Sequence, residues 1–157
     1  MTSCNVQGNQ SNSDEFTPDF RITPSDREEY KKFGSGPFMN MPHEPDYKNI
    51  EISLDKDVYQ PNDKVVVTLK NNNPGHGFYY FNTPEIYFEN QGSYEYIEFI
   101  NLQPGMWEFC GIEGSKDQFS TNAIVDLTDA KFDLSPGKYK LVFFVGERDC
   151  IAYFEVK

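Results

Sequence analysis

The chain has 157 residues, of which 38% are hydrophobic and 16% aromatic, and its 14 Lys and Arg stand against 25 Asp and Glu, a formal net charge of −11. That charge repels nucleic-acid phosphates and anionic lipid surfaces, so we expect no nucleic-acid partner. With two histidines and no clustered cysteines there is little material for a zinc site or a serine-hydrolase triad, and we expect no metal and no cofactor.

The chain divides by composition into two parts. Residues 1–46 are mostly polar and cannot bury enough apolar surface to offset the entropy cost of ordering, so they predict a flexible tether. Inside it, Ser25 is followed three residues later by Glu28, a capping signal that predicts a short helix over residues 25–33. No apolar run approaches the ~20 residues that span a bilayer.

From residue 47 the pattern changes to period-two alternation, which is typical of half-buried strands. Ile50, Ile52 and Leu54 alternate with polar residues, and Val65, Val67 and Leu69 do the same. Further strands are predicted at residues 77–81, 85–89, 94–100, 106–110 and 123–127. The clearest are 138–145 and 150–156, joined by a four-residue turn at 146–149. Residues 47–157 therefore predict an all-β, Ig-like antiparallel sandwich of about seven to nine strands rather than a lipocalin-like barrel.

Two turns carry the most information. In each, a proline that fixes φ is followed by a residue that tolerates positive φ, namely Pro61 with Asn62 and Pro136 with Gly137. Both therefore predict type II turns. Tyr139 follows the second turn, where a tyrosine corner sits in Ig-like sandwiches, and its hydroxyl is predicted to bond back to the preceding loop.

These turns and strands resemble a known family. The segments DVYQPNDKVVVTLKNNN, LSPGKYKLVFF and AYFEVK look like the bacterial immunoglobulin-like domains of extracytoplasmic proteins, over roughly residues 49–157. The resemblance implies a structural or adhesive role outside the cytoplasm. The antibody-type Cys, Trp, Cys core is absent, because Val67 and Leu141 stand at the expected cysteine positions.

The same opening pattern also resembles the bacterial intracellular proteinase inhibitor family, which is another Ig-like sandwich. That resemblance implies inhibition through an exposed loop, for which the charge-rich segment Gly111–Thr121 is the candidate.

The start of the chain has a second resemblance. Thr2-Ser3-Cys4 is similar to the end of a bacterial lipobox, whose cysteine receives a lipid, although the hydrophobic signal region that precedes a lipobox is missing. It implies lipidation of Cys4, with the polar tether holding the domain away from the membrane. The protein would then be a cell-surface lipoprotein or secreted; the alternative is an incidental N-terminal cysteine.

Cys110 and Cys150 have two interpretations. An exported protein permits a disulfide between them. Alternatively, both are buried and reduced and pack as small hydrophobes. Cys150 shares parity with Phe154 and Val156, so it is predicted to point inward.

The ionisable residues do not indicate catalysis. Glu85, Glu89, Glu95 and Glu98 could pair as in a glycosidase, but Glu95 and Glu98 flank Ile97 and fit a solvated strand edge. We therefore expect no catalytic residue and no enzyme.

Aromatic residues are dense between positions 78 and 99. Alternation places about half of them away from the core, so some tyrosines are predicted to be exposed, as in carbohydrate-binding modules and protein interfaces. The alternative is a shared aromatic core with a second element covering the outer rings. The candidate ligand-binding residues are Tyr79, Tyr80, Tyr87, Tyr94 and Tyr96.

Taken together, the sequence predicts a monomeric, non-enzymatic, extracytoplasmic Ig-like module that is structural or presents a ligand-binding surface. Its ligand is a protein or a glycan, and it meets a membrane only through a lipid anchor. A proteinase inhibitor is the first alternative and a carbohydrate-binding module the second.

Overall fold

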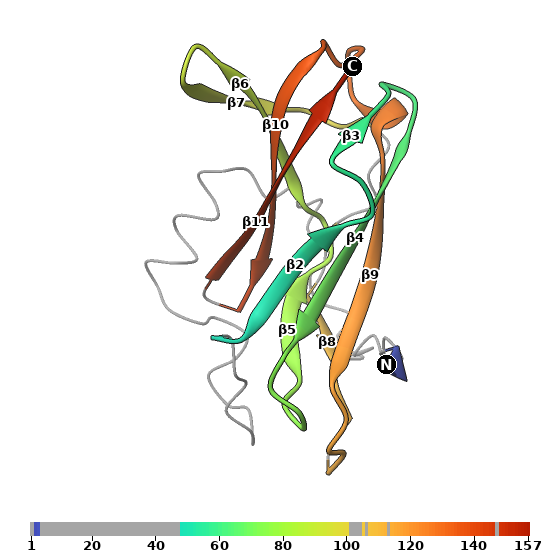
Figure 1. The fold of residues 1–157 in the computed structure, drawn as a ribbon, viewed down its shortest axis with the longest axis vertical. Helices are drawn as coiled ribbons and strands as arrows, with labels where there is room; N and C mark the ends of the chain where they lie inside the picture. The colour runs from blue at the N-terminus through green and yellow to red at the C-terminus, as the bar shows by residue number, and fades with distance from the viewer. Residues whose placement is uncertain (1, 4–47, 101–104, 106, 113, 147) are drawn as a thin grey trace, which may run out of the picture.

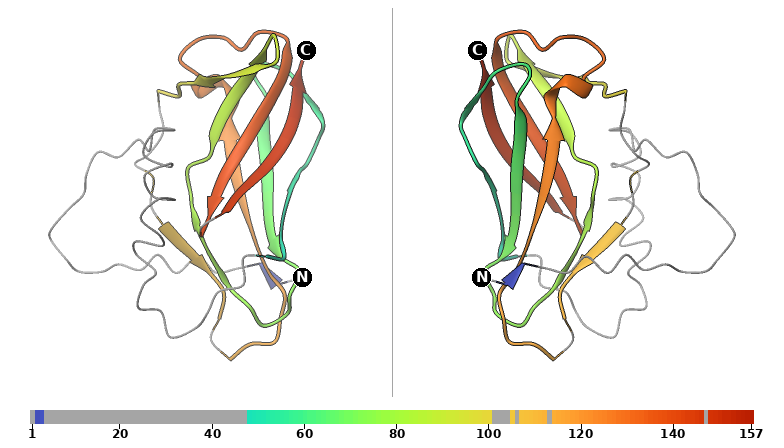
Figure 2. Two further views of the ribbon diagram at one scale, coloured as in Figure 1. Left: turned by 90° about the vertical axis from the view of Figure 1, so that its left-hand side faces the viewer. Right: turned by 90° about the vertical axis from the view of Figure 1, so that its right-hand side faces the viewer.

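The computed structural model describes residues 2–3, 48–100, 105, 107–112, 114–146 and 148–157. These residues form an all-β sandwich of two sheets, as predicted, shown in Figures 1 and 2. The four-stranded sheet has the order β1 (Thr2–Ser3), β9 (Phe119–Asp126), β4 (Lys64–Asn71), β2 (Ile50–Leu54). The seven-stranded sheet contains β3 (Val58–Tyr59), β11 (Arg148–Val156), β10 (Gly137–Val145), β5 (Phe78–Phe81), β8 (Trp107–Cys110), β6 (Glu85–Asn90) and β7 (Ser93–Ile97).

The core lies between the sheets and follows the predicted alternation. Val65, Val67 and Leu69 of β4 are at most 1% exposed. Facing them from the other sheet are the inward residues of β10, namely Tyr139, Leu141, Phe143 and Val145. Figure 2 shows the two layers from the side, with the red C-terminal hairpin in one and β4 and β9 in the other. Period two therefore places one face of these strands in the core, and on β10 Val142 and Phe144 of the other face are buried as well.

Several strand boundaries differ from the prediction. β9 begins at Phe119, four residues before the predicted start at Ala123, and β7 ends at Ile97 rather than at Ile100. The early part of β9 reads Phe-Ser-Thr-Asn, where polar residues interrupt the apolar signal although Phe119 and Thr121 are buried. Backbone pairing with β4 at Lys70↔Ser120 and Leu69↔Thr121 extends the strand there.

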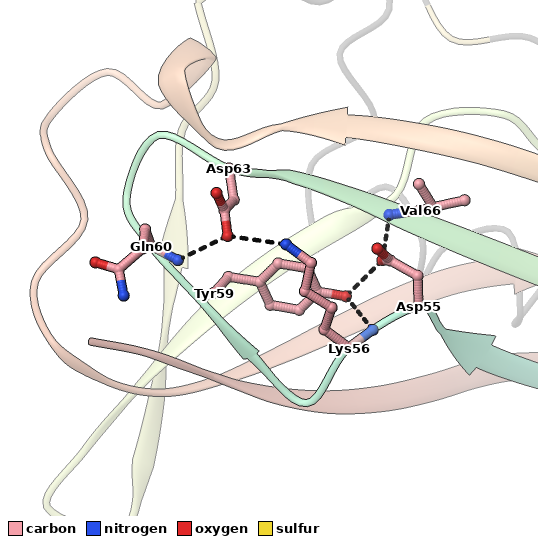
Figure 3. A network of polar contacts seen from close by, with 6 residues as sticks. All are labelled: Asp55, Lys56, Tyr59, Gln60, Asp63 and Val66. Atoms are coloured by element: carbon pink, nitrogen blue, oxygen red, sulfur yellow. Dashed lines mark hydrogen bonds and ion pairs between the residues drawn. The ribbon is translucent and has the colours of Figure 1, made fainter.

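The first strand of the domain is split between the sheets. β2 pairs antiparallel with β4 in one sheet, and β3 pairs parallel with β11 in the other. The crossing is held by Asp55, whose Oδ1 accepts hydrogen bonds from the Tyr59 hydroxyl and the Val66 N–H, each at 2.8 Å (Figure 3). The Tyr59 ring is 1% exposed, so one buried side chain links both layers.

The turn after β3 is hydrogen-bonded but is not type II. Pro61 and Asn62 occupy its central positions, and Asp63 N–H donates to Gln60 O at 3.0 Å. Among the described residues outside glycine, only Gln91 has a positive φ, so Asn62 does not supply the conformation that type II needs. The Asp63 carboxylate instead accepts from Gln60 N–H at 3.0 Å and fixes the turn from the side (Figure 3).

The turn before β10 is not type II either, because Gly137 has φ +153° rather than the +80° that type II requires. Glycine is needed at this position for packing. A Cβ at position 137 would lie 2.7 Å from the Phe88 ring. Two residues later, the predicted tyrosine corner is confirmed, because the Tyr139 hydroxyl donates to Ser135 O at 2.7 Å and the ring is 1% exposed.

The C-terminal hairpin is tighter than predicted. Val145 pairs with Arg148, so the connection has two residues instead of four, and Gly146 adopts φ +54°. β11 therefore starts at Arg148 rather than Cys150, and the register of the hairpin differs by two residues from the predicted one.

The middle of the chain forms a second hairpin. β5 and β6 both pair with β10, and β6 continues into β7 through Gln91 and Gly92, which have φ of +51° and +84°. Two positive φ angles in a two-residue loop are typical of a type I′ turn. Figure 1 shows this hairpin projecting at the end of the sandwich where the C-terminus lies.

Some sequence predictions concern the N-terminal part. Cys4, the helix over residues 25–33 and most of the tether lie outside the described residues. Thr2 and Ser3 fall within the predicted tether, but they form β1 and pair parallel with Phe119 and Ser120 of β9. This pairing uses the backbone of an edge strand, which leaves no mark in side-chain alternation.

In the part of the chain that is described, no helix has the length and hydropathy to cross a bilayer.

Candidate functional site

The outer face of the larger sheet carries a row of side chains at one level. Tyr87 of β6 pairs with Tyr96 of β7 and with Lys140 of β10, and Lys140 pairs in turn with Tyr153 of β11. Directly paired residues in a sheet point to the same side. Four neighbouring strands therefore present Tyr96, Tyr87, Lys140 and Tyr153 in a line on the outer side.

A second row lies one pair further along the strands. Glu89 of β6 pairs with Tyr94 of β7, and Lys138 of β10 pairs with Glu155 of β11, which also pairs with Val58 of β3. We call the two rows together the tyrosine face; its members are Tyr87, Glu89, Tyr94, Tyr96, Lys138, Lys140, Tyr153 and Glu155.

Three of the four tyrosines on this face are open to solvent. Tyr94 and Tyr96 are each 40% exposed and Tyr153 is 62% exposed. Tyr87 is half-buried, packs edge-on against Tyr96 with ring centroids 5.8 Å apart, and donates its hydroxyl proton to Glu85. The rings of Tyr87 and Tyr96 thus hold each other on the sheet, while the exposed rings remain accessible to a ligand.

Lys140 connects the two rows. Its ammonium lies 4.8 Å from the Tyr87 ring centroid and 4.2 Å from that of Tyr94. A cation at this distance is attracted by the electron-rich ring face. Partial desolvation, together with the charge of Glu89 and the nearby Tyr153 phenol, raises the pKa of Tyr94, so this phenol stays neutral at physiological pH.

A groove of about 640 Å³ runs beside Tyr153, across β6, β10, β11 and β3. Tyr139 and Phe154 also line it, although their rings are 1% and 3% exposed and stack in the core with centroids 5.4 Å apart. The other lining residues are Asp57, Val58, Glu89, Lys138, Tyr153, Glu155 and Lys157. The volume is in the range of ligand pockets, ~300–1,000 Å³.

The structure separates the five tyrosines that the sequence singled out. Tyr87, Tyr94 and Tyr96 belong to the tyrosine face. Tyr79 lies on another part of the sheet, half-buried, with its ring centroid 4.6 Å from that of Phe109. Tyr80 points into the core and is 3% exposed, so the prediction that it contacts a ligand is wrong.

Tyr80 instead belongs to a polar cluster at the margin of the core. Its hydroxyl donates to Glu108 Oε2 at 2.5 Å and lies 3.4 Å from Thr121 Oγ1 on the opposite sheet. Asn82 Nδ2 donates to the other oxygen of Glu108 at 2.9 Å. Burial and the hydrogen bond to Glu108 raise the pKa of Tyr80 above its usual value. This cluster satisfies buried polar groups.

The disulfide between Cys110 and Cys150 is not formed. Cys110 is disulfide-bonded, but Cys150 is a free thiol, so the two do not pair with each other. β8 and β11 are separated by β5 and β10 in the sheet. Three strand spacings amount to about 14 Å, whereas a disulfide needs Cα atoms within ~7 Å. The inward orientation of Cys150 is confirmed, because it is 6% exposed.

The carboxylates considered for catalysis have separate surroundings. Glu98 forms an ion pair with Lys131 at 3.0 Å, and Glu95 accepts from Asn90 at 2.7 Å. Glu85 is 4% exposed and accepts from Tyr87, so it is not part of a solvated edge. Within the described residues, no group of three or more His, Cys, Asp or Glu is placed to hold a metal ion.

The loop considered for proteinase inhibition is shorter than expected, since Phe119 and the residues after it belong to β9. It is bonded to the neighbouring β4–β5 loop. Gly75 N–H donates to Asp117 O at 2.8 Å, and Gln118 Nε2 donates to Asn72 O at 3.1 Å.

Sequence reasoning missed Tyr153 and Lys140 as members of the site. Their signal was present, because Tyr153 alternates with the inward residues Phe154 and Cys150, and Lys140 alternates with Tyr139 and Leu141. The pairing register of β6, β10 and β11, which brings these residues side by side, could not be predicted from alternation alone.

Comparison with known proteins gives a similarity of fold only. No family model and no curated protein matches the chain. The alkylpurine DNA glycosylase AlkC of Pseudomonas fluorescens, bound to DNA with an abasic site analogue, is similar over 84% of this chain, with a TM-score of 0.46 and 13% identity. The chain spans 34% of the length of that protein. The sulfur carrier protein SoxY of Chlorobium limicola f thiosulfatophilum is similar over 85% of this chain and 98% of its own, with a TM-score of 0.29 and 15% identity.

Proposed function

We propose that the protein is a non-enzymatic, extracytoplasmic binding module that contacts its ligand through the tyrosine face. The observation that carries the proposal is the register that lines up Tyr96, Tyr87, Lys140 and Tyr153 across four strands. Single exposed aromatic residues are common on protein surfaces, but a contiguous group of them marks an interaction site. Tyrosine suits that role because its ring packs and its hydroxyl forms hydrogen bonds.

The location of the module is a further part of the proposal. It is supported by the resemblance to bacterial Ig-like domains and by the disulfide of Cys110, because disulfides persist mainly outside the cytoplasm.

The test uses the full chain and two matched double variants. Tyr96→Ala with Tyr153→Ala removes the two ends of the row. Ile124→Ala with Phe132→Ala removes two residues outside the tyrosine face that are 68% and 77% exposed. Binding is measured by biolayer interferometry against immobilised cellulose, chitin and xylan fragments, and against collagen, fibrinogen and subtilisin.

We expect wild type and the control variant to bind the same probe, and the tyrosine variant to lose at least tenfold in affinity. Equal binding by all three proteins would contradict the proposed surface. Inhibition of subtilisin by all three would favour the proteinase inhibitor instead.

A further inference from the structure

The groove beside Tyr153 is distinguished by the balance of its charges. Its rim carries the carboxylates of Asp57, Glu89 and Glu155 and the amines of Lys138 and Lys157. The exposed pair Lys157–Glu155, with an N···O distance of 3.8 Å, neutralises part of this set. Lys140, one pair along β10 from Lys138, adds a third positive charge to the same face.

This balance disfavours ligands with a large charge of either sign. A polyanion meets three carboxylates here, and the net charge of −11 repels it from the whole molecule. A polycation meets the amines of Lys138, Lys140 and Lys157. A neutral ligand with many hydroxyls avoids both penalties, because a hydroxyl donates to carboxylates and accepts from ammonium groups.

The groove also offers an apolar platform. Tyr153 is 62% exposed, and among the described residues no other aromatic ring or cation packs against it. On the core side of the sheet, the buried rings of Tyr139 and Phe154 stack and support the two strands that carry the groove.

We propose that this groove binds a neutral oligosaccharide, with one sugar ring stacked on Tyr153 and the hydroxyls of the chain bonded to Glu89, Lys138 and Glu155. The inference rests on the proposed function, because it assigns a ligand class to part of the tyrosine face. The groove crosses four strands, which suits an extended chain more than a single sugar.

The experiment is an NMR titration of the ¹⁵N-labelled full chain. The probes are cellohexaose, xylohexaose, mannohexaose and chitohexaose as neutral ligands, with hexagalacturonate as an anionic control and hexalysine as a cationic one. We expect at least one neutral hexasaccharide to shift the amide signals of residues around β3, β10 and β11. Tyr153→Ala should weaken binding at least tenfold, Tyr153→Phe should change it less than threefold, and Phe132→Ala should leave it unchanged.

The outcomes separate this inference from the proposed function. If no neutral hexasaccharide shifts the groove signals, or if a charged hexamer binds there more tightly, the inference is wrong. If a sugar or protein binds at Tyr94 and Tyr96 without involving Tyr153, the tyrosine face survives and the groove assignment fails. If Tyr153→Ala retains full affinity for a neutral hexasaccharide, the stacked geometry is wrong.

Discussion

The Lys140 ammonium lies 4.2 Å from the centroid of the Tyr94 ring, although strand β6 runs between β10 and β7. The Lys140 side chain therefore crosses β6 to reach Tyr94 on β7, the far strand of the projecting hairpin. The contacts of Lys140 with Tyr87 and Tyr94 tie that hairpin to β10 and hold these two rings in place.

Lys140→Met keeps an unbranched side chain that is one atom shorter and removes its charge. We expect the free energy of unfolding to fall by about 1 kcal/mol, because two cation–π contacts are lost, each worth ~0.5–1 kcal/mol at partly exposed sites. Urea unfolding of the variant, compared with Lys116→Met in the exposed β8–β9 loop, measures the difference. Equal midpoints for the two variants would show that the ring contacts do not stabilise the fold.

Tyr139→Phe removes one hydroxyl and nothing else. Because this hydroxyl donates to Ser135 O at 2.7 Å beside a buried ring, its loss leaves that carbonyl without its donor and should cost about 1–2 kcal/mol. Tyr153→Phe is the matched control, since its ring is 62% exposed. Thermal melting should separate the two variants; an unchanged Tm for Tyr139→Phe would refute a stabilising corner.

The lowered pKa of Asp55 predicts that the free energy of unfolding falls at acid pH. Although its partial burial acts to raise the pKa, hydrogen bonds from the Tyr59 hydroxyl and the Val66 N–H lower it below its usual value. The unfolded chain then takes up the proton at higher pH than the folded one. Stability from this group is therefore complete above pH ~4 and declines as the pH falls further.

Asp55→Asn should thus be less stable than wild type at pH 7 and should lose less stability on acidification. Asp63 behaves like Asp55, because hydrogen bonds from the Gln60 N–H and Lys56 lower its pKa, so some acid sensitivity persists in the variant. Urea unfolding from pH 7 to pH ~2.5 provides the curves. Asp133→Asn, at an exposed position before β10, controls for the loss of one negative charge. Parallel curves for wild type and Asp55→Asn would rule out the Asp55 contribution.

Cys150 should be inert in the folded protein. Burial raises the pKa of its thiol to about 11, and the thiolate is the reactive form. Iodoacetamide at pH 8 should leave the Cys150 peptide unmodified until urea unfolds the chain, as read by peptide mass mapping. Rapid alkylation under native conditions would mean that β11 opens locally.

The sequence predicted those parts of the fold that depend on local chemistry. Alternation in Ile50–Leu54 and at Val65, Val67 and Leu69 marked strands with one buried face, and the position of Tyr139 after a Pro-Gly turn marked the corner. In each case the signal lies within a few residues of the structure that it specifies.

The candidate site depends on register, which is not local. A four-residue turn at 146–149 would have placed Glu155 opposite Lys140, whereas the two-residue turn places Tyr153 there. Gly146 adopts φ +54° in the two-residue turn, and glycine also accepts the conformations of a longer turn, so the sequence alone does not fix the register. Tyr80 was misplaced for a related reason, because its neighbours Tyr79 and Phe81 are aromatic as well and the FYYF run carries no alternation from which to tell the inner face.

The split first strand has a mechanical consequence. β3 runs parallel to β11, and the two are joined by Glu155 N–H to Asp57 O at 2.9 Å and Lys157 N–H to Tyr59 O at 3.0 Å. Tension applied between residues 48 and 157 would pull these parallel strands along their length in opposite directions. Both hydrogen bonds would then bear the load together in shear, instead of breaking one after the other.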